Sequence, residues 1–382
     1  MALQFQRNAK LYVELTSSHG GVTSPPFIWQ IPVLEGFTFS QAINTSEITV
    51  NEAGNTSRRG RLLFNDSLAP VEWSFSTYAR PHLSSSLSPN TVHAVEEALW
   101  AMFIGAGMYD GSDNWDNGDQ VSPQISPITH AAATATFDFS ASNVAAMSDN
   151  WNLYFAFEET GNNQVYKASR AAVNSATIDF DIDGIATIQW SGFARTLEDY
   201  SLANSPADSI TANYTEAITG TSNFIRNRLT DITLVRNDVS PEDTYNVVAT
   251  GGSITFENNI TYLTPEELGI VNNPLANVTG ARSVSGNITC YLDNNQSDSK
   301  SGELFADLVA DTDDTRNVFD LDIFVGGNGN KPGVQFSLPT AHLEIPSINL
   351  EDLLTLDIGF HGQPSDGDID NTDEATIIYH AE

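Results

Sequence analysis

The sequence predicts a mainly β protein with two tandem β-sandwich or barrel-like domains, each carrying one flanking α-helix. Three observations support this fold class. Apolar and polar residues alternate through most of the chain, only two short windows have helical periodicity, and the second half repeats the apolar pattern of the first. Alternation with period two places successive side chains on opposite faces of a strand, so such runs form sheets with one buried face.

The expected strands follow one another along the chain with polar turns between them. Bulky β-branched or aromatic residues occupy every second position, as at Leu153, Phe155 and Phe157, which is typical of strands. The strands cover residues 11–15, 37–39, 71–75, 153–157, 178–182, 188–190, 321–325, 343–345 and 354–358.

Two windows predict short amphipathic helices, each fit to cover a sheet. Apolar residues recur at helical spacing on one side of each window. In residues 90–106 these are Val92, Val95, Leu99, Met102 and Phe103. In residues 301–310 they are Leu304, Phe305 and Leu308.

The second half of the chain repeats the first half in order, which predicts an internal duplication. The segment 36–43 matches 253–260, and one constant offset relates the strands that follow the two helices. The matched residues include Val71 with Val284, Phe75 with Ile288, Tyr78 with Tyr291, Trp151 with Phe319, Phe180 with Ile348 and Trp190 with Ile358. The polar stretch 203–222 separates a first domain, 1–210, from a second, 211–382, and a loop inserted at 107–127 is expected on the surface.

The chain is acidic because basic residues are scarce. It has 49 Asp and Glu against 16 Lys and Arg, a formal net charge of −33, although only 17% of its residues are charged. It lacks the cations that neutralise nucleic-acid phosphates or anionic lipid head groups, which excludes a conventional DNA-binding or membrane-surface protein. Adaptation to high salt is an independent explanation of the same acidity.

Targeting and redox signals are weak. No segment has the composition of a signal peptide, and none approaches the roughly 18 apolar residues of a membrane span, so a soluble chain made in a cytoplasm is expected. The single cysteine, Cys290, lies in an alternating apolar run and is expected to be a buried, inert thiol.

No motif predicts an enzyme or a cofactor. The seven histidines show no ligand pair at helical or strand spacing and are expected individually at the surface or at interfaces, and no Gly-x-Ser-x-Gly motif occurs. Asp366, Asp368 and Asp370 begin like a calcium loop, but Asn371 stands where glycine is needed and Ile377 where a bidentate acid is needed. A solvated turn is the favoured interpretation, with calcium as the alternative.

Several segments of the first half occur in an order that resembles a known family. They are the strand 34–39, the polar segment 44–66 with Gly54, Arg58, Arg59 and Arg61, the strand 71–81, the helix around 95–100 and the paired strands of 176–193. In this order the chain is similar to the major tail tube proteins of long-tailed bacteriophages and related tailed viruses. The resemblance is weaker in the second half, where 262–281 lacks the arginine cluster.

The resemblance implies two tail-tube domains that assemble into stacked rings around a channel for viral DNA, which passes without specific binding. With the domain duplicated, three chains supply six domains, so a homotrimeric ring with pseudo-sixfold symmetry is implied. The family also implies a place in the virion tail, assembly in the host cytoplasm along a tape measure protein, and contacts with tail terminator and baseplate proteins.

Strand alternation nominates residues that face away from the core and toward such a channel. The candidates are Asp179, Asp181, Asp183, Gln189, Asn349, Glu351 and Asp357. A negatively charged lumen would repel DNA, which carries one charge per about 1.7 Å of helix axis. The alternative is that these residues form the ordinary solvated face of a two-layer domain.

Arg58, Arg59 and Arg61 form a dense basic cluster in an otherwise acidic chain. The resemblance implies that the loop carrying them reaches a neighbouring subunit or ring, where carboxylates would orient assembly. The alternative is an exposed turn.

Two other functions are compatible with these patterns. One is another ring-forming tail component, such as a sheath, terminator or baseplate-hub protein. The other is a tandem β-sandwich carbohydrate-binding or adhesin module, which predicts a monomer with an aromatic-lined pocket. Negative-stain microscopy separates them, because a tube protein forms stacked rings, the other tail components form single rings, and the binding module forms isolated particles.

Overall fold

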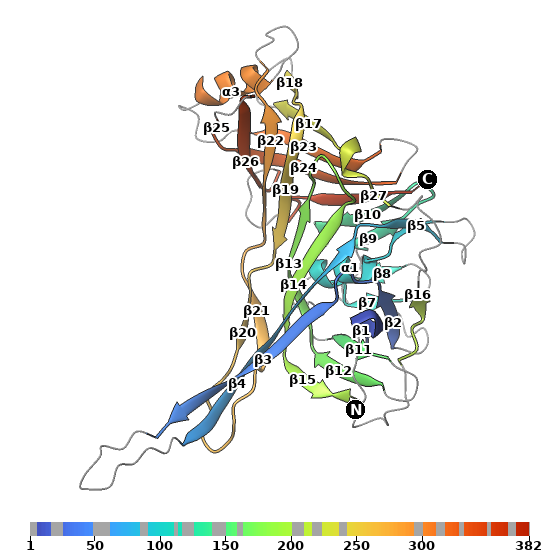
Figure 1. Cartoon of the computed structure of the whole chain (residues 1–382), viewed down its shortest axis with the longest axis vertical. Coiled ribbons are helices and arrows are strands. Elements are labelled where there is room, and N and C mark those ends of the chain that lie inside the picture. The colour runs from blue at the N-terminus through green and yellow to red at the C-terminus, as the bar shows by residue number, and fades with distance from the viewer. Residues whose placement is uncertain are drawn as a thin grey trace, which may run out of the picture.

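A computed structural model of the chain describes residues 6–16, 26–48, 62–84, 91–110, 114–116, 126–139, 150–158, 163–200, 210–215, 224–236, 243–293, 301–310, 318–327, 332–349, 353–365 and 372–381. β-Strands dominate this part of the chain, which confirms the mainly β fold class (Figure 1).

Two large sheets contain most of the strands. The smaller has the order β15 (Thr196–Asp199), β12 (Gln164–Ser169), β11 (Trp151–Phe157), β1 (Ala9–Leu15), β2 (Phe27–Ile31) and β16 (Tyr214–Thr215). The larger follows the path β18 (Asp243–Asn246), β17 (Asp231–Arg236), β23 (Phe319–Gly326), β24 (Gly333–Leu343), β26 (Thr355–Gly362), β22 (Ser283–Tyr291), β19 (Ala249–Glu257), β13 (Ala172–Asp179), β14 (Thr187–Ala194), β4 (Leu63–Tyr78) and β3 (Phe37–Glu47).

Shorter elements complete the described part. Strands that join the larger sheet beside its main path are β27 (Thr376–His380), β10 (Thr134–Asp138), β9 (Ile128–His130) and β25 (Ser347–Asn349). Two-stranded pairs are formed by β5 (Pro81–Leu83) with β6 (Val92–Ala94), β7 (Met108–Tyr109) with β8 (Trp115–Asp116), and β20 (Ile260–Leu263) with β21 (Ala276–Thr279). The helical segments are α1 (Glu97–Ile104), α3 (Ser301–Ala310), η1 (Gln6–Asn8) and η4 (Asn227–Leu229).

Strands at matching places in the two halves pair in the same order. β11 lies between β1 and β12, as β23 lies between β17 and β24. In the first half β14 lies between β13 and β4, and in the second half β26 lies between β25 and β22. In addition, β3 pairs with β4 in the first half and β19 pairs with β22 in the second. Phe75 lies opposite Trp190 and Ile288 opposite Ile358, which are positions matched in the sequence.

Elsewhere the register shows that the sequence match is wrong by two residues. Ile178 lies opposite Ile188 and Ile348 lies opposite Leu356, so Ile348 occupies the place of Ile178 and not that of Phe180. The sequence match of 36–43 with 253–260 is also displaced by two residues from the correspondence that the strand pairing gives, in which Phe39 corresponds to Ile254 and not to Phe256. A shift of two residues keeps every side chain on its original face, so alternation does not detect it.

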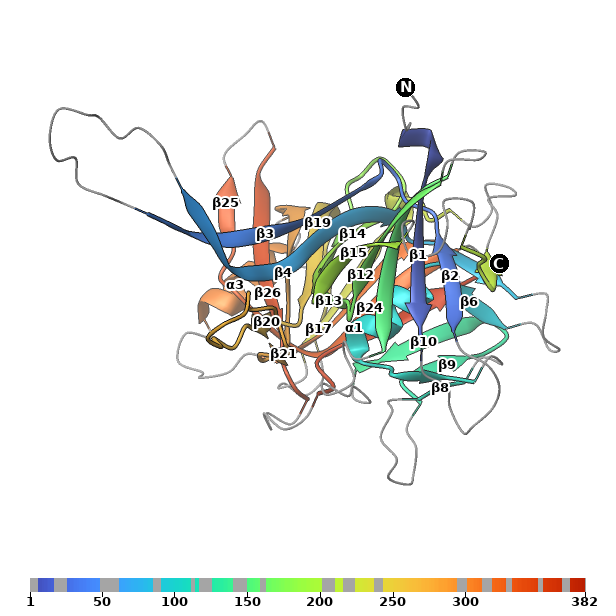
Figure 2. The same cartoon turned by 90° about the horizontal axis from the view of Figure 1, so that it is seen from below.

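The two halves are joined into one sheet by the antiparallel pairing of β13 with β19, as the view in Figure 2 shows. Ala176 lies opposite Phe256 and Ile178 lies opposite Ile254. β10 and β27 form a second connection between the halves. One hydrophobic cluster therefore contains residues from both halves of the chain.

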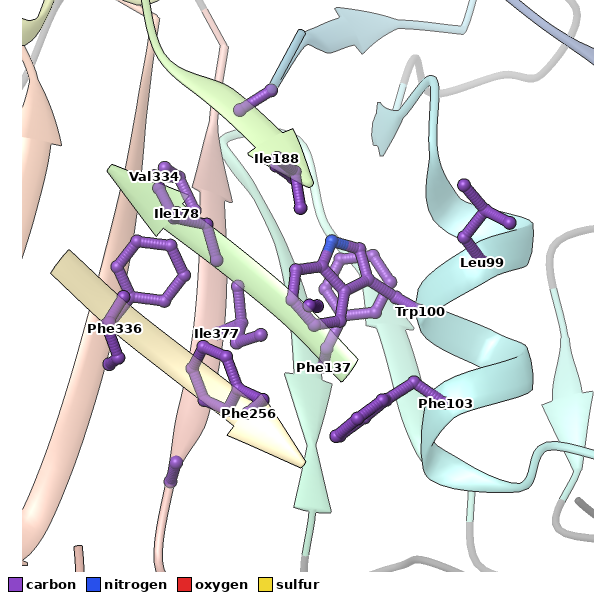
Figure 3. Close-up of a cluster of buried hydrophobic side chains, with 14 of the residues drawn as sticks. Leu99, Trp100, Phe103, Phe137, Ile178, Ile188, Phe256, Val334, Phe336 and Ile377 are labelled. Carbon is purple, nitrogen blue, oxygen red and sulfur yellow. The ribbon is translucent and has the colours of Figure 1, made fainter. Parts of the chain in front are cut away.

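Helix α1 lies at the centre of this shared core (Figure 3). The ring of Trp100 lies 4.7 Å from that of Trp190 and 5.7 Å from that of Phe256, both edge-on. Phe103 also contacts the ring of Phe256, at 6.3 Å. Edge-to-face aromatic contacts add to the free energy gained from burying these large rings.

The prediction of a one-sided first helix was wrong. All eight residues of α1 are buried, because β13 and β10 pack on the helix and Tyr379 of β27 bonds to Trp100. The helix also begins at Glu97 and not near residue 90, since Val92–Ala94 forms β6 and pairs with β5. α3 keeps the predicted pattern, with Leu304 and Leu308 buried and Val309 exposed.

The expected surface loop at 107–127 contributes to the core. Trp115 is buried and stacks on Trp29 at 5.5 Å and on Trp151 at 6.1 Å. The alternation and helix patterns gave no sign of this, because a single tryptophan between Asp and Asn residues has no period. Burial of its large ring holds the β7–β8 hairpin against the smaller sheet.

A buried polar group ties the start of α1 to the last strand. Tyr379 of β27 donates a hydrogen bond to Glu96 Oε1 at 2.5 Å and accepts one from Trp100 Nε1 at 2.9 Å. The backbone N–H of Arg80 also donates to Glu96 Oε1, at 3.1 Å. Burial raises the pKa of Glu96 from its ordinary value of 4.5 to about 7, although these hydrogen bonds and the charge of Arg80 lower it.

We expect Phe256→Ala to lower the free energy of unfolding by roughly 3–5 kcal/mol, the range for truncating a buried aromatic side chain. All six tryptophans belong to the first half, whereas Phe256 belongs to the second. Urea unfolding followed by tryptophan fluorescence should therefore shift, because the core is shared. The control is Leu268→Ala, whose side chain is 100% exposed. An unchanged fluorescence transition in Phe256→Ala would contradict the shared core.

We expect Glu96→Gln to flatten the fall of stability between about pH 5 and pH 8. A carboxyl whose folded pKa is raised stabilises the fold below its unfolded pKa, and that contribution is lost as the pH rises through the folded pKa. A rise from 4.5 to about 7 corresponds to roughly 3 kcal/mol. Urea titrations at several pH values measure the difference between variant and wild type. Glu344→Gln, at an exposed carboxylate, is the control, and equal slopes in wild type and Glu96→Gln would refute the assignment.

Candidate channel-facing surface

The larger sheet has a polar face opposite its core face. Strand register aligns this face into three rows that run across both halves of the chain. The first row is Thr38, Ser74, Ser191, Ser175, Glu257 and Ser283. The second is Ser76, Gln189, Thr177, Thr255, Ser285 and His361. The third is Tyr78, Thr187, Asp179, Ser253, Asn287 and Gly359. We call these three rows the polar face.

The hydroxyl groups of the polar face bind one another across the strands. Oxygen-to-oxygen distances are 2.7 Å between Thr38 and Ser74, 2.8 Å between Ser175 and Ser191, and 3.1 Å between Thr177 and Thr255. Each hydroxyl that is paired in this way offers less hydrogen-bonding capacity to a passing ligand. The face is therefore hydrophilic, and part of its hydrogen-bonding capacity is used between its own strands.

Charge on the polar face is negative and sparse. Its three rows contain the carboxylates Asp179 and Glu257 and the imidazole of His361, and neither lysine nor arginine. Burial and the charge of Asp181 raise the pKa of Asp179, whereas the hydrogen bond from Gln189 Nε2, at 3.1 Å, lowers it. A surface of this kind has no cation with which to hold a phosphate backbone.

Only part of the predicted channel set lies on this face. Asp179 and Gln189 are neighbours there, and Asp357 lies beside it on β26, where its carboxylate accepts from Asn287 Nδ2 at 3.0 Å. Asp181 and Asp183 lie in the exposed turn after β13, where Asp183 Oδ1 is 3.9 Å from Arg228 Nη1. Asn349 lies exposed on β25, and Glu351 is outside the described residues.

The arginine cluster and the calcium alternative fall outside the described residues. Arg58, Arg59 and Arg61 lie outside the described residues, in the segment that connects β3 to β4. Asp366, Asp368 and Asp370 of the calcium alternative also lie outside them.

β3 and β4 extend well beyond the sheet as a two-stranded arm, visible in Figure 1. The sequence predicted only residues 37–39 of the first strand, because 44–66 is polar overall. Near its far end the arm exposes Ile43, Leu63 and Phe64. A second extension, between β20 and β21, exposes Leu268 and Ile270 and contacts the first where Leu68 N–H donates to Asn272 O at 2.8 Å. Exposed apolar groups of this kind mark surfaces that contact other chains.

The expectation of isolated surface histidines was wrong for His93 and His130. Their side chains are only 11% and 3% exposed and both lie against Glu97. No sequence pattern indicates this contact, because His93 lies on β6, Glu97 begins α1 and His130 lies on β9.

Comparison with known proteins identifies the family of this chain. The family model of phage tail tube proteins matches residues 83–368. The chain therefore belongs to the phage tail tube protein family, and it is a structural protein of the virion tail, the subunit of which the tail tube is built. It is similar to the tail tube protein pb6 of Escherichia phage T5, with 29% identity over 373 residues that span 96% of this chain and 74% of pb6. Among the helices described here, none has the length and apolar character needed to cross a membrane.

Proposed function

We propose that three copies of this chain form one ring of the tail tube, with pseudo-sixfold symmetry. Each copy would contribute two tail-tube domains, 1–210 and 211–382, and the polar face would line the channel. The matching order of strand pairing in the two halves supports the duplication. A role in assembly and conduction, without catalysis, accords with a surface of mutually bonded hydroxyl groups.

The strand pairing that joins β13 to β19 within one chain would be repeated between neighbouring copies. Register places β25 at the position of β13, and β3 at the position of β19. In the described residues β25 pairs with β26 and β3 with β4, so each leaves an edge toward solvent. Pairing β25 of one copy with β3 of the next repeats the internal junction, and closure of the ring removes both edges.

The exposure of two equivalent isoleucines carries this proposal. Ile178 is 0% exposed within the core and lies opposite Ile254 of β19, whereas Ile348 is 43% exposed on β25. In the ring, Phe39 of the neighbouring copy would lie opposite Ile348, as Ile254 lies opposite Ile178 within the chain. Burial of the two apolar side chains would stabilise the ring.

The polar face would let DNA slide because it offers no cation to bind the phosphate backbone and carries carboxylates that repel it. Asp179, Gln189 and Asp357 belong to or border this face, and Asn349 would join it at the junction between copies. Asp181, Asp183 and Glu351 would add negative charge at its margin. Repulsion by these carboxylates would keep phosphates from the wall.

The arm and the β20–β21 extension would contact the adjacent ring. Their exposed apolar residues need a partner surface, and Arg58, Arg59 and Arg61 at the arm would meet carboxylates of that ring. The tape measure protein inside the tube, and terminator and baseplate proteins at its ends, are the further partners that we propose.

We expect the double variant Thr38→Cys, Asn349→Cys to form disulfides between copies, because these positions are equivalent to the opposed pair Ser253 and Asp179. Directly opposed residues of antiparallel strands have the short Cβ separation that a disulfide needs. Oxidised rings run on a non-reducing gel should give covalent trimers as the largest product. Thr38→Cys with Ser347→Cys, displaced by two residues, is the matched control. Cys290 is buried and should not interfere. Products larger than trimers, or equal yields from both pairs, would refute the arrangement.

We expect Gln189→Lys to make assembled tubes retain DNA, because it adds a cation to the polar face in every copy. Gel-shift titrations of preformed tubes with short duplex DNA at low and high salt measure this retention, which salt should abolish. Gln164→Lys makes the same chemical change on the smaller sheet and should have little effect. If both variants bind DNA equally, the polar face is not the channel wall.

A further inference from the structure

Three side chains from separate elements converge at the start of α1. His93 Nδ1 of β6 lies 2.9 Å from Glu97 Oε2, and His130 Nε2 of β9 lies 3.1 Å from the same oxygen. The side chain of Glu97 is only 7% exposed. The candidate ligand atoms of the three residues all lie within 4.8 Å of one another.

Neighbouring groups orient this cluster as outer partners orient metal ligands. Trp115 Nε1 donates to Glu97 Oε1 at 2.6 Å, which leaves Oε2 directed at the two imidazole rings. His93 Nε2 lies 3.1 Å from Thr91 Oγ1. When His93 Nε2–H donates to that hydroxyl, the lone pair of His93 Nδ1 is directed toward the cluster. A metal-bound histidine commonly donates its other ring N–H in this way.

The charge balance of the cluster leaves room for a cation. The rings of His93 and His130 stack with centroids 4.1 Å apart, so a second positive charge on these rings would be close to the first. Glu97 Oε2 lies 2.9 Å from His93 Nδ1 and 3.1 Å from His130 Nε2, so the cluster offers one carboxylate oxygen between two imidazole nitrogens.

We propose that His93, Glu97 and His130 bind one Zn²⁺-class transition-metal ion, with water as the fourth ligand. Two imidazole nitrogens and one carboxylate oxygen form a donor set that suits zinc, which prefers tetrahedral coordination. Binding would use the ring nitrogen lone pairs that face the cluster, with the single N–H of each neutral imidazole on its other nitrogen, where that of His93 can donate to Thr91 Oγ1. The ion would connect α1 to β6 and to β9, which in turn pairs with β10 and so with the last strand, β27.

The test uses the purified full-length chain after treatment with chelator and dialysis. Titration calorimetry with Zn²⁺ should give one site per chain, and the melting temperature should rise on binding. Co²⁺ should give the visible absorption of a tetrahedral site. His93→Gln and His130→Gln should each abolish the absorption and the rise in melting temperature. His361→Gln should change neither, since His361 forms a comparable pair with Glu344, at 3.1 Å, that is exposed and has no third candidate ligand among the described residues.

The wild-type chain decides the outcome even if a variant misfolds, as judged by circular dichroism. X-ray absorption of the Zn²⁺-loaded wild type should report two imidazole ligands. Absence of Zn²⁺ and Co²⁺ binding by the folded wild type would overturn the proposal and leave the cluster as a hydrogen-bond network. Unaltered binding in folded His93→Gln or His130→Gln would overturn it equally.

Discussion

The antiparallel pairing of β13 with β19 is the contact on which the rest of the structure depends. Sheet edges with unsatisfied backbone groups invite pairing, and here an edge of each half satisfies the other. The pairing brings Phe256 over Trp100, so one core serves both halves. It also aligns Thr177 with Thr255 and Asp179 with Ser253, which makes the polar face continuous. The same geometry, repeated between copies, would close a ring.

Burial of α1 on all sides places polar groups in the core, where they need partners. The two acidic residues at the start of the helix have different hydrogen-bonding partners. Glu96 is held by Tyr379 of the last strand, whereas Glu97 is held by Trp115 and by His93 and His130. Carboxylates at a helix N-terminus are also favoured by the helix dipole. These contacts connect α1 to segments that are distant in the sequence and thereby orient the covering strands.

Alternation in the sequence was sufficient to identify several long central strands, among them β1, β4, β11, β14, β23 and β26, and the burial of Cys290. Alternation was not sufficient to predict the register, that is, which residues lie opposite one another on paired strands. Ile348 and Phe180 were matched by a constant offset, yet the strand partners show that Ile348 corresponds to Ile178. It also missed Trp115 and the convergence of His93, Glu97 and His130, since their contacts join elements with no shared period.

The sequence by itself determined the class of this protein, because period-two patterns, scarce bases and the order of segments are local properties of the chain. Within the strands that it identified, it also determined which side chains face away from the core, since a strand alternates whatever it pairs with. The tertiary structure alone decided which strands pair across the halves, which polar residues share a row and which edge is left exposed. These depend on contacts between residues far apart in the chain, where a displacement of two residues leaves the local pattern unchanged.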